Sequence, residues 1–303
     1  MKSARLRSFV QKIRTVIHCA ITAWLDHRAA SKGAALAFYT LFSMAPILVL
    51  VIAIAGFFYG TDTAQREILA QLRGLVGAKG AEAIQLILAG ASNKDQGRAA
   101  TLIAGVLLLF GATSVFAELK DSLDEIWQTP VSTGSGLLDM VRTRLLSFGL
   151  ILVLAFLLMV SLVVSAALAV LERYWGGLWK DAAVLLGYLT GLIGFSVIAV
   201  LFGVIYKMLP RVRLSWHDVV IGALGTAGLF ALGKYAIGLY IGNSGIANSF
   251  GAAGSVIALL LWVYYSAQIF FLGAEFTRQY AVQLGSLRHS TQPEARDALA
   301  ENQ

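Results

Sequence analysis

The chain has 303 residues, of which 58% are hydrophobic and 14% are charged, and its mean hydropathy is +0.74. Soluble domains average roughly 45–50% apolar and about 25% charged residues. This composition therefore excludes an ordinary cytosolic enzyme, a disordered tail protein and a secreted disulfide scaffold, and it predicts a membrane protein. The single cysteine, Cys19, permits no internal disulfide. The formal net charge of +7 suits either an anionic membrane surface or nucleic acid.

Six long stretches of the chain are nearly free of charge. They are 34–58, 99–117, 145–171, 182–206, 216–241 and 252–273. Each has 19 to 27 residues. A helix needs ~20 residues to cross roughly 30 Å of hydrocarbon. We predict an all-α polytopic bundle in which a six-span membrane domain, 34–276, lies between an N-terminal segment, 1–33, and a mostly disordered tail, 277–303.

Lysines and arginines are unevenly distributed among the segments that join these spans. Seven of the 24 lie in 59–98 and 172–181, one is Lys234, and the other sixteen lie in 1–33, 118–144, 207–215 and the C-terminal tail. Because basic residues accumulate in cytoplasmic segments, this bias predicts that both termini are cytoplasmic. The positive charge is then mainly topogenic, which favours anionic lipid headgroups over nucleic acid as partners.

The N-terminal segment is predicted to be an amphipathic helix. At 100° per residue, one face collects Leu6, Phe9, Val10, Ile13, Val16, Ile17, Ala20 and Trp24. Basic residues flank this face, as in helices that lie on an anionic leaflet. The alternative is a helix that packs on the cytoplasmic ends of the bundle.

The loop 59–98 is predicted to be helical and external. Thr61 or Asp62 can cap a first short helix, and a second apolar stretch follows Gly77. These two helices either form a hairpin or lie on the outer surface.

Signatures of enzymes are missing from the sequence. The four histidines have no metal-ligand spacing, and there is no G-x-S-x-G, P-loop or dinucleotide-binding motif. The acidic cluster Glu118, Asp121, Asp124 and Glu125 is either a metal site or a solvated helix end, and we favour the latter because Lys120 can pair with Asp124. We predict no catalytic residue, no metal and no cofactor.

Charges in or near the membrane are more informative, because burying a charge is costly. Lys234 lies inside the fifth span, where it can snorkel outward, pair with an acid, or bind an anionic headgroup. Glu275 follows the sixth span, where it either coordinates a cation or proton or pairs with Arg278. A basic rim near Pro210 either grips phosphate headgroups or reflects topology alone, and it comprises Lys207, Arg211 and Arg213.

Other features concern the shape of the backbone. Pro46, after Ser43, is predicted to bend or break the first span, as in helices that line binding cavities. Two groups of small residues predict close helix packing, Gly187 with Gly191 and the stripe Ala223, Ala227 and Ala231. The segment 242–255 is either an external gate or a tight glycine-rich turn, and its candidate site residues are Asn243, Asn248, Gly251, Gly254 and Ser255.

Several of these stretches resemble motifs of one known family, in the family's order. They are Ala34-Ala-Leu-Ala-Phe-Tyr-Thr-Leu-Phe-Ser-Met-Ala-Pro46, Ser122-Leu-Asp-Glu-Ile-Trp127, Tyr206-Lys-Met-Leu-Pro210, Phe250-Gly-Ala-Ala-Gly-Ser255, Trp262-Val-Tyr264 and Gly273-Ala-Glu275. Together they resemble the YihY/virulence factor BrkB family, historically labelled ribonuclease BN-like. The chain departs from the family pattern at Ser122-Leu-Asp124 and in the loosened motif 250–255.

The resemblance implies a bacterial inner-membrane protein of the cell envelope with six spans and cytoplasmic termini. Some relatives have been linked to export of lipid A precursors or other envelope lipids, which implies a translocator of an anionic lipid or similar amphiphile. The ribonuclease label finds no support in the residues. A non-transporting envelope scaffold is the alternative function, and a homo-oligomer is possible without being predicted.

Overall fold

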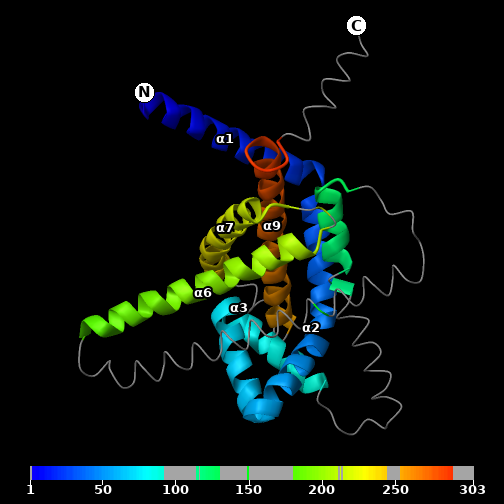
Figure 1. The fold of residues 1–303 in the computed structure, drawn as a ribbon. Coiled ribbons are helices and arrows are strands. Elements are labelled where there is room, and N and C mark those ends of the chain that lie inside the picture. Colours follow the sequence, from blue (N-terminus) through cyan, green and yellow to red (C-terminus); the bar gives the residue numbers. More distant parts are fainter. Residues whose placement is uncertain are drawn as a thin grey trace.

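The computed structural model describes residues 2–91, 114–115, 117–129, 149, 180–210, 212, 214–243 and 253–288. Regular secondary structure within these ranges is helical, which confirms the all-α prediction (Figure 1). The helices are α1 Lys2–Asp26, α2 Ala29–Tyr59, α3 Thr61–Ala91, α6 Lys180–Met208, α7 Trp216–Asn243 and α9 Ala253–Gln283. A further short helix occupies 117–126.

Helix α9 is the centre of the arrangement. It contacts α1, α2, α3 and α7, and α6 packs on α7. Figure 1 shows α2 running alongside α9, α1 crossing one end of it, and α3 lying at the opposite end. The fold therefore places the α1–α2 junction beside the C-terminal part of α9.

Three described helices are long and apolar enough to cross a membrane: Tyr188–Met208, Trp216–Ile241 and Ala253–Gln283. A fourth candidate is the bent pair Ala29–Met44 and Ile47–Tyr59, whose halves meet at 47°. The predicted spans 99–117 and 145–171 lie almost wholly outside the described residues. The six-span count and the cytoplasmic orientation of both termini therefore stay predictions.

Helix α9 starts one residue from the predicted start of the sixth span, whereas its end differs from the prediction. The helix begins at Ala253, so Gly254 and Ser255 are helical and buried rather than part of an exposed turn. It also continues past residue 273 to Gln283, so Glu275 and Arg278 lie within the helix. The polar residues after 273 marked the expected exit from the bilayer, but packing against α1 extends the helix beyond that point.

The apolar side of helix α1 is partly packed on the bundle and partly exposed. Val16 and Ala20 are buried, and α1 contacts α9. An adjoining stripe is exposed, which consists of Val10 and Ile17 of the predicted face together with Ile21 and Leu25 beside it. At 100° per residue these four lie within a single sector next to the buried one. Half of the face thus packs on the bundle, and half is left for another apolar environment.

Helix α3 confirms the two predicted helices in the loop 59–98. Gly77 has φ 78° and ψ 176°, and this non-helical residue separates the two halves. Such a positive φ favours glycine, because a side chain would clash with the backbone. The second half packs into the bundle, because Ile84 and Leu88 are buried in a cluster with Leu48 of α2 and Leu259 of α9.

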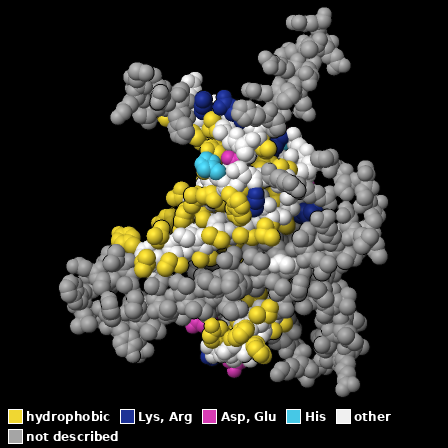
Figure 2. Space-filling view, in the orientation of Figure 1, with side chains coloured by type: hydrophobic (Ala, Val, Ile, Leu, Met, Phe, Trp, Pro, Cys, Tyr) yellow, Lys and Arg dark blue, Asp and Glu magenta, His cyan; other side chains and the backbone are white. Residues whose placement is uncertain are grey.

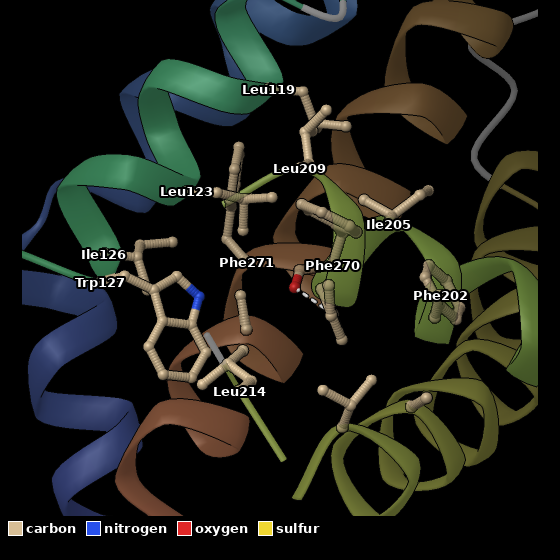
Figure 3. Close-up of a cluster of buried hydrophobic side chains, with 14 of the residues drawn as sticks. Leu119, Leu123, Ile126, Trp127, Phe202, Ile205, Leu209, Leu214, Phe270 and Phe271 are labelled. Atoms are coloured by element: carbon tan, nitrogen blue, oxygen red, sulfur yellow. Dashed lines mark hydrogen bonds between the residues drawn. The ribbon is translucent and has the colours of Figure 1, made fainter. Parts of the chain in front are cut away.

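A larger apolar cluster lies against one face of the helix 117–126 (Figure 3). One face of this helix inserts Leu119, Leu123 and Ile126 toward α6 and α9, and Trp127 follows. The facing side chains include Phe202, Ile205 and Leu209 of α6 with Phe270 and Phe271 of α9. On the opposite face Asp121 and Glu125 are exposed, whereas Glu118 and Asp124 are half-buried.

Helices α7 and α9 meet through a reciprocal glycine–threonine contact. A Cβ on Gly222 would lie 1.9 Å from Thr277 Oγ1, and a Cβ on Gly273 would lie 2.0 Å from Thr226 Oγ1. Each threonine donates to the glycine four residues earlier on its own helix, at 2.8 Å for Thr226 and 2.6 Å for Thr277. Tyr206 of α6 completes the contact by donating to the Phe270 carbonyl at 2.7 Å.

The predicted small-residue faces are only partly used. Ala223 and Ala227 are buried as predicted, whereas Ala231 is exposed. Gly191 is exposed, and no described atom lies within 4 Å of the position its Cβ would take. Close packing at Gly187 and Gly191 therefore stays a prediction, whereas the side of α7 that carries Gly222 and Thr226 makes a close contact among the described residues.

A second clasp joins the start of α7 to the turn after α9. Asp218 is buried, and its Oδ2 accepts from the Ser286 backbone N–H at 2.9 Å and from the Ser286 hydroxyl at 2.6 Å. Gly285 lies so close that a Cβ there would be 2.3 Å from Asp218 Oδ1. This clasp fixes the C-terminal end of α9 against α7.

Candidate functional site

Lys234 projects from the exposed side of α7, inside a candidate span. Its Nζ donates to the Gly74 carbonyl of α3 at 3.1 Å. The flanking side chains Leu232 and Tyr235 are 73% and 72% exposed. Within the described ranges no carboxylate lies within 4.0 Å of Nζ, so the structure brings Lys234 to a backbone oxygen and not to an acid.

Glu275 is fully buried beside the α1–α2 junction. Its Oε1 lies 2.5 Å from His27 Nδ1, and His27 replaces Arg278 as the predicted ion-pair partner. The physical reason is the extended α9, which turns Glu275 toward the junction that packs on this helix. Its second oxygen, Oε2, is buried with no hydrogen-bond partner among the described residues.

Lys32 ties this pair to neighbouring elements. Its Nζ donates to the His27 carbonyl at 2.7 Å and lies 2.7 Å from Glu125 Oε1 of the helix 117–126. Between the two, Arg28 adopts the left-handed conformation with φ 52°, which allows α2 to turn away from α1. Four elements therefore meet at this point: α1, α2, α9 and the helix 117–126.

The acidic face of the helix 117–126 behaves as the spacing predicts. Lys120 Nζ lies 2.9 Å from Asp124 Oδ2, which confirms the i,i+4 pair. Burial raises the pKa of Glu118, and the nearby Asp121 carboxylate raises it further against the opposing effect of Lys32. In the described ranges, no three side chains of His, Cys, Asp or Glu gather as a metal site would require.

The other predicted pathway residues fall at separate places. Ser43 is buried and donates to the Thr40 carbonyl of its own helix at 3.3 Å. Pro46 lies between the two halves of the bent α2. Lys207 donates to the Leu214 carbonyl, and its Nζ lies 5.2 Å from the ring centroid of Trp216. Arg211 and Arg213 lie outside the described residues.

The predicted external loop is mostly not described. Asn243 is the last residue of α7, and Asn248 and Gly251 lie outside the described residues. Gly254 and Ser255 belong to the first turn of α9. The structure therefore does not bring the five predicted loop residues together as one site.

Lys234 and Glu275 belong to two different sites. Next to Lys234, Gly233 faces Tyr265 and Ile269 of α9. Glu275 lies ten residues beyond Tyr265, which corresponds to roughly 15 Å along a helix axis. Sequence reasoning missed His27 altogether, because its contact with Glu275 joins residues 248 positions apart and no local spacing encodes it.

The surface around these sites defines the class of protein. Large apolar side chains are exposed along α6 and α7, and Figure 2 shows them covering the face over these two helices. Those on α6 are Tyr188, Leu189, Leu192 and Val200, and those on α7 include Val220, Leu224, Leu229, Leu232 and Leu239. Exposed apolar faces on helices long enough to span a bilayer are those of an integral membrane protein.

The chain belongs to the virulence factor BrkB family, whose model matches residues 20–298. It is similar to the UPF0761 membrane protein of Pseudomonas paraeruginosa, with 26% identity over 83% of this chain and 59% of the relative. The UPF0761 membrane protein of Ralstonia nicotianae is 25% identical over 88% and 58%. That of Neisseria meningitidis serogroup B is 24% identical over 78% and 56%.

This chain thus spans just under three fifths of the length of these curated relatives. No solved structure matches it.

Proposed function

We propose that this integral membrane protein translocates an anionic lipid, or a lipid-like envelope precursor, across the bacterial inner membrane. The observation that carries the proposal is the exposed ammonium of Lys234 on the apolar side of a candidate span. A charge near the middle of a bilayer costs roughly 2.5–3.5 kcal/mol on insertion scales, so such charges are usually paired or functional.

The hydrogen bonds of Lys234 leave room for a ligand. An ammonium has three donors, and the Gly74 carbonyl takes one of them. The remaining donors are available to phosphate oxygens of a headgroup whose acyl chains lie on the exposed apolar side chains of α7. The contact also anchors Lys234 to α3, close to the break at Gly77.

The bend in α2 is consistent with this function. Broken spans line binding pathways in many transporters, since they present unpaired backbone groups inside the membrane. No nucleotide-binding motif occurs in the sequence, so directional transport by this chain would depend on a gradient. The proposal assigns the chain no catalytic residue, cofactor or nucleic-acid partner, and it places both termini in the cytoplasm on the strength of the lysine and arginine distribution.

A scaffold that binds partners through the loop 59–98 is less well supported. Ile84 and Leu88 were the natural partner-facing candidates of that loop, but they are buried against α2 and α9. Substitution there would disturb the core of this protein before it disturbed a partner.

Lys234→Ala is expected to slow exchange of an anionic lipid about tenfold, since it removes a charge-assisted hydrogen bond of about 1.5 kcal/mol. The measurement uses the purified protein in sealed liposomes that contain fluorescent anionic or zwitterionic lipid analogues. A quencher added outside bleaches more than the outer leaflet only when lipids exchange.

Two variants control this experiment. Lys234→Arg keeps the charge and is expected to retain exchange, and Lys79→Ala removes an exposed lysine that pairs with Glu82 on α3. Equal exchange by Lys234→Ala and the unmodified protein would show that the lysine merely snorkels. Bleaching no greater than in protein-free liposomes would remove the proposed exchange of these lipids.

A further inference from the structure

The pair formed by His27 and Glu275 has a geometry that the proposed function leaves unexplained. At 2.5 Å, His27 Nδ1 and Glu275 Oε1 must share a proton, because two lone pairs would repel at that distance. Oε2 of the same carboxyl group is buried and has no partner among the described residues. An ionised carboxylate with one such oxygen is costly, since burial penalises charge and an unmade hydrogen bond adds to the cost.

The pair also connects the interior to solvent. The Glu275 side chain is 0% exposed, whereas the His27 side chain is 19% exposed. Since Nδ1 faces Glu275, a proton that enters from the exposed side of His27 would be taken up at the other ring nitrogen, Nε2. A partly exposed imidazole that contacts a buried acid through one nitrogen and can take up a proton at the other is suited to act as a proton shuttle.

We infer that His27 and Glu275 form a proton-binding site, and that proton uptake there loosens the α1–α2 junction from α9. Nε2 takes a proton from solvent while the Nδ1 proton passes to Glu275 Oε1. The N–H bond at Nε2 and the O–H bond at Glu275 form, while the N–H bond at Nδ1 and one O–H bond of a solvent hydronium ion break, so the pair gains a single proton and the solvent donor leaves as water. The imidazole stays neutral, and the carboxylate becomes a neutral acid.

Charged groups around the pair come from each neighbouring element. Lys32 of α2 and Arg278 of α9 both act on Glu275. Glu125 of the helix 117–126 pairs with Lys32. Among the other helices that pack near α9, α7 carries Asp218, which is engaged with Ser286, and α6 carries Tyr206, which donates to the Phe270 carbonyl. Neutralising Glu275 therefore weakens its attraction for Lys32 and Arg278 and leaves the other pairs in place.

The consequence is local. Lys32 holds the His27 carbonyl and Glu125 together, so this lysine transmits a change at Glu275 to both α2 and the helix 117–126. The proton site would couple transport to a proton gradient, and this coupling rests on the proposed lipid translocation. The existence of the proton site does not rest on that function.

The first test is infrared difference spectroscopy of the full-length protein in detergent, without lipid substrate, between about pH 8 and about pH 5. We expect a protonated-carboxyl C=O band that is lost in Glu275→Gln and kept in Glu67→Gln, an exposed acid on α3. His27→Gln retains an amide donor for Oε1 and is expected to move the pH at which the band grows. The proton site is overturned if Glu275→Gln keeps the band or if the unmodified protein has no band. The role of His27 is overturned if the band of His27→Gln grows at the same pH as that of the unmodified protein.

The second test separates this inference from the proposed function. In liposomes with a pH gradient, exchange by the unmodified protein is expected to depend on the gradient, and exchange by Glu275→Gln is expected to lose that dependence. Exchange that ignores the gradient in the unmodified protein overturns the coupling. A Glu275 infrared band in a protein that exchanges no lipid supports the proton site and overturns the translocator.

Discussion

Gly222→Ala is expected to lower the free energy of unfolding by about 3 kcal/mol, at the upper end of what overpacking usually costs. The added Cβ would lie 1.9 Å from Thr277 Oγ1 and 2.7 Å from Thr277 Cβ. Rotation of the Thr277 side chain does not relieve the contact with its Cβ, and it breaks the hydrogen bond from the Thr277 hydroxyl to the Gly273 carbonyl. The measurement is thermal unfolding of the purified protein in one detergent.

Gly228→Ala is the matched control on the same helix. No atom of the described residues lies within 4 Å of the added Cβ, and alanine favours the helix by roughly 1 kcal/mol relative to glycine. Adding Thr277→Gly to Gly222→Ala is expected to recover part of the loss, since it moves the small residue to the other helix. Equal midpoint temperatures of thermal unfolding for Gly222→Ala and Gly228→Ala would be incompatible with the close contact of α7 and α9.

Asp218→Ala is expected to destabilise the protein by about 2–4 kcal/mol, because hydrogen bonds to a charged group contribute roughly 1.5–3 kcal/mol each. The substitution removes both acceptor contacts to Ser286 and releases the turn after α9. Thermal unfolding gives the overall loss. Proteolysis near residue 286 is expected to become faster, since the turn is no longer held.

Two substitutions test the origin of this effect. Asp218→Asn keeps an accepting oxygen and is expected to lose less stability than Asp218→Ala. His217→Ala removes a largely exposed imidazole that lies 3.8 Å from Asp218, and a surface pair of this kind contributes little. A loss for His217→Ala as large as that for Asp218→Ala would assign the effect to the helix start rather than to the clasp.

The positions of α6 and α7 were predictable from the sequence, because a helix that crosses a bilayer must be apolar over most of its length. The start of α9 was predictable within a residue, whereas its end was not. Glu275 and Arg278 look like the polar exit from a membrane, and only the tertiary contact with α1 shows why the helix continues. The break at Gly77 was likewise visible in the sequence, while the burial of Ile84 was not.

The candidate sites divide in the same way. The pair of Lys120 and Asp124 follows from spacing on one helix, so the sequence is sufficient to predict it. The partners of Lys234 and Glu275 are Gly74 and His27, far away along the chain. An unusual charge inside an apolar stretch marks a residue as interesting, but only the folded arrangement identifies what that charge contacts.

The reciprocal glycine–threonine contact limits how the bundle can move. Sliding α9 by one turn along α7 would set Thr226 against Thr277 in one direction and against Ile269 in the other, and neither arrangement permits the same close approach. The two helices are therefore expected to travel as one rigid body in any alternating-access cycle. We then expect the moving boundary to lie where α1 and α2 meet α9, because the buried polar pair of His27 and Glu275 lies at that boundary.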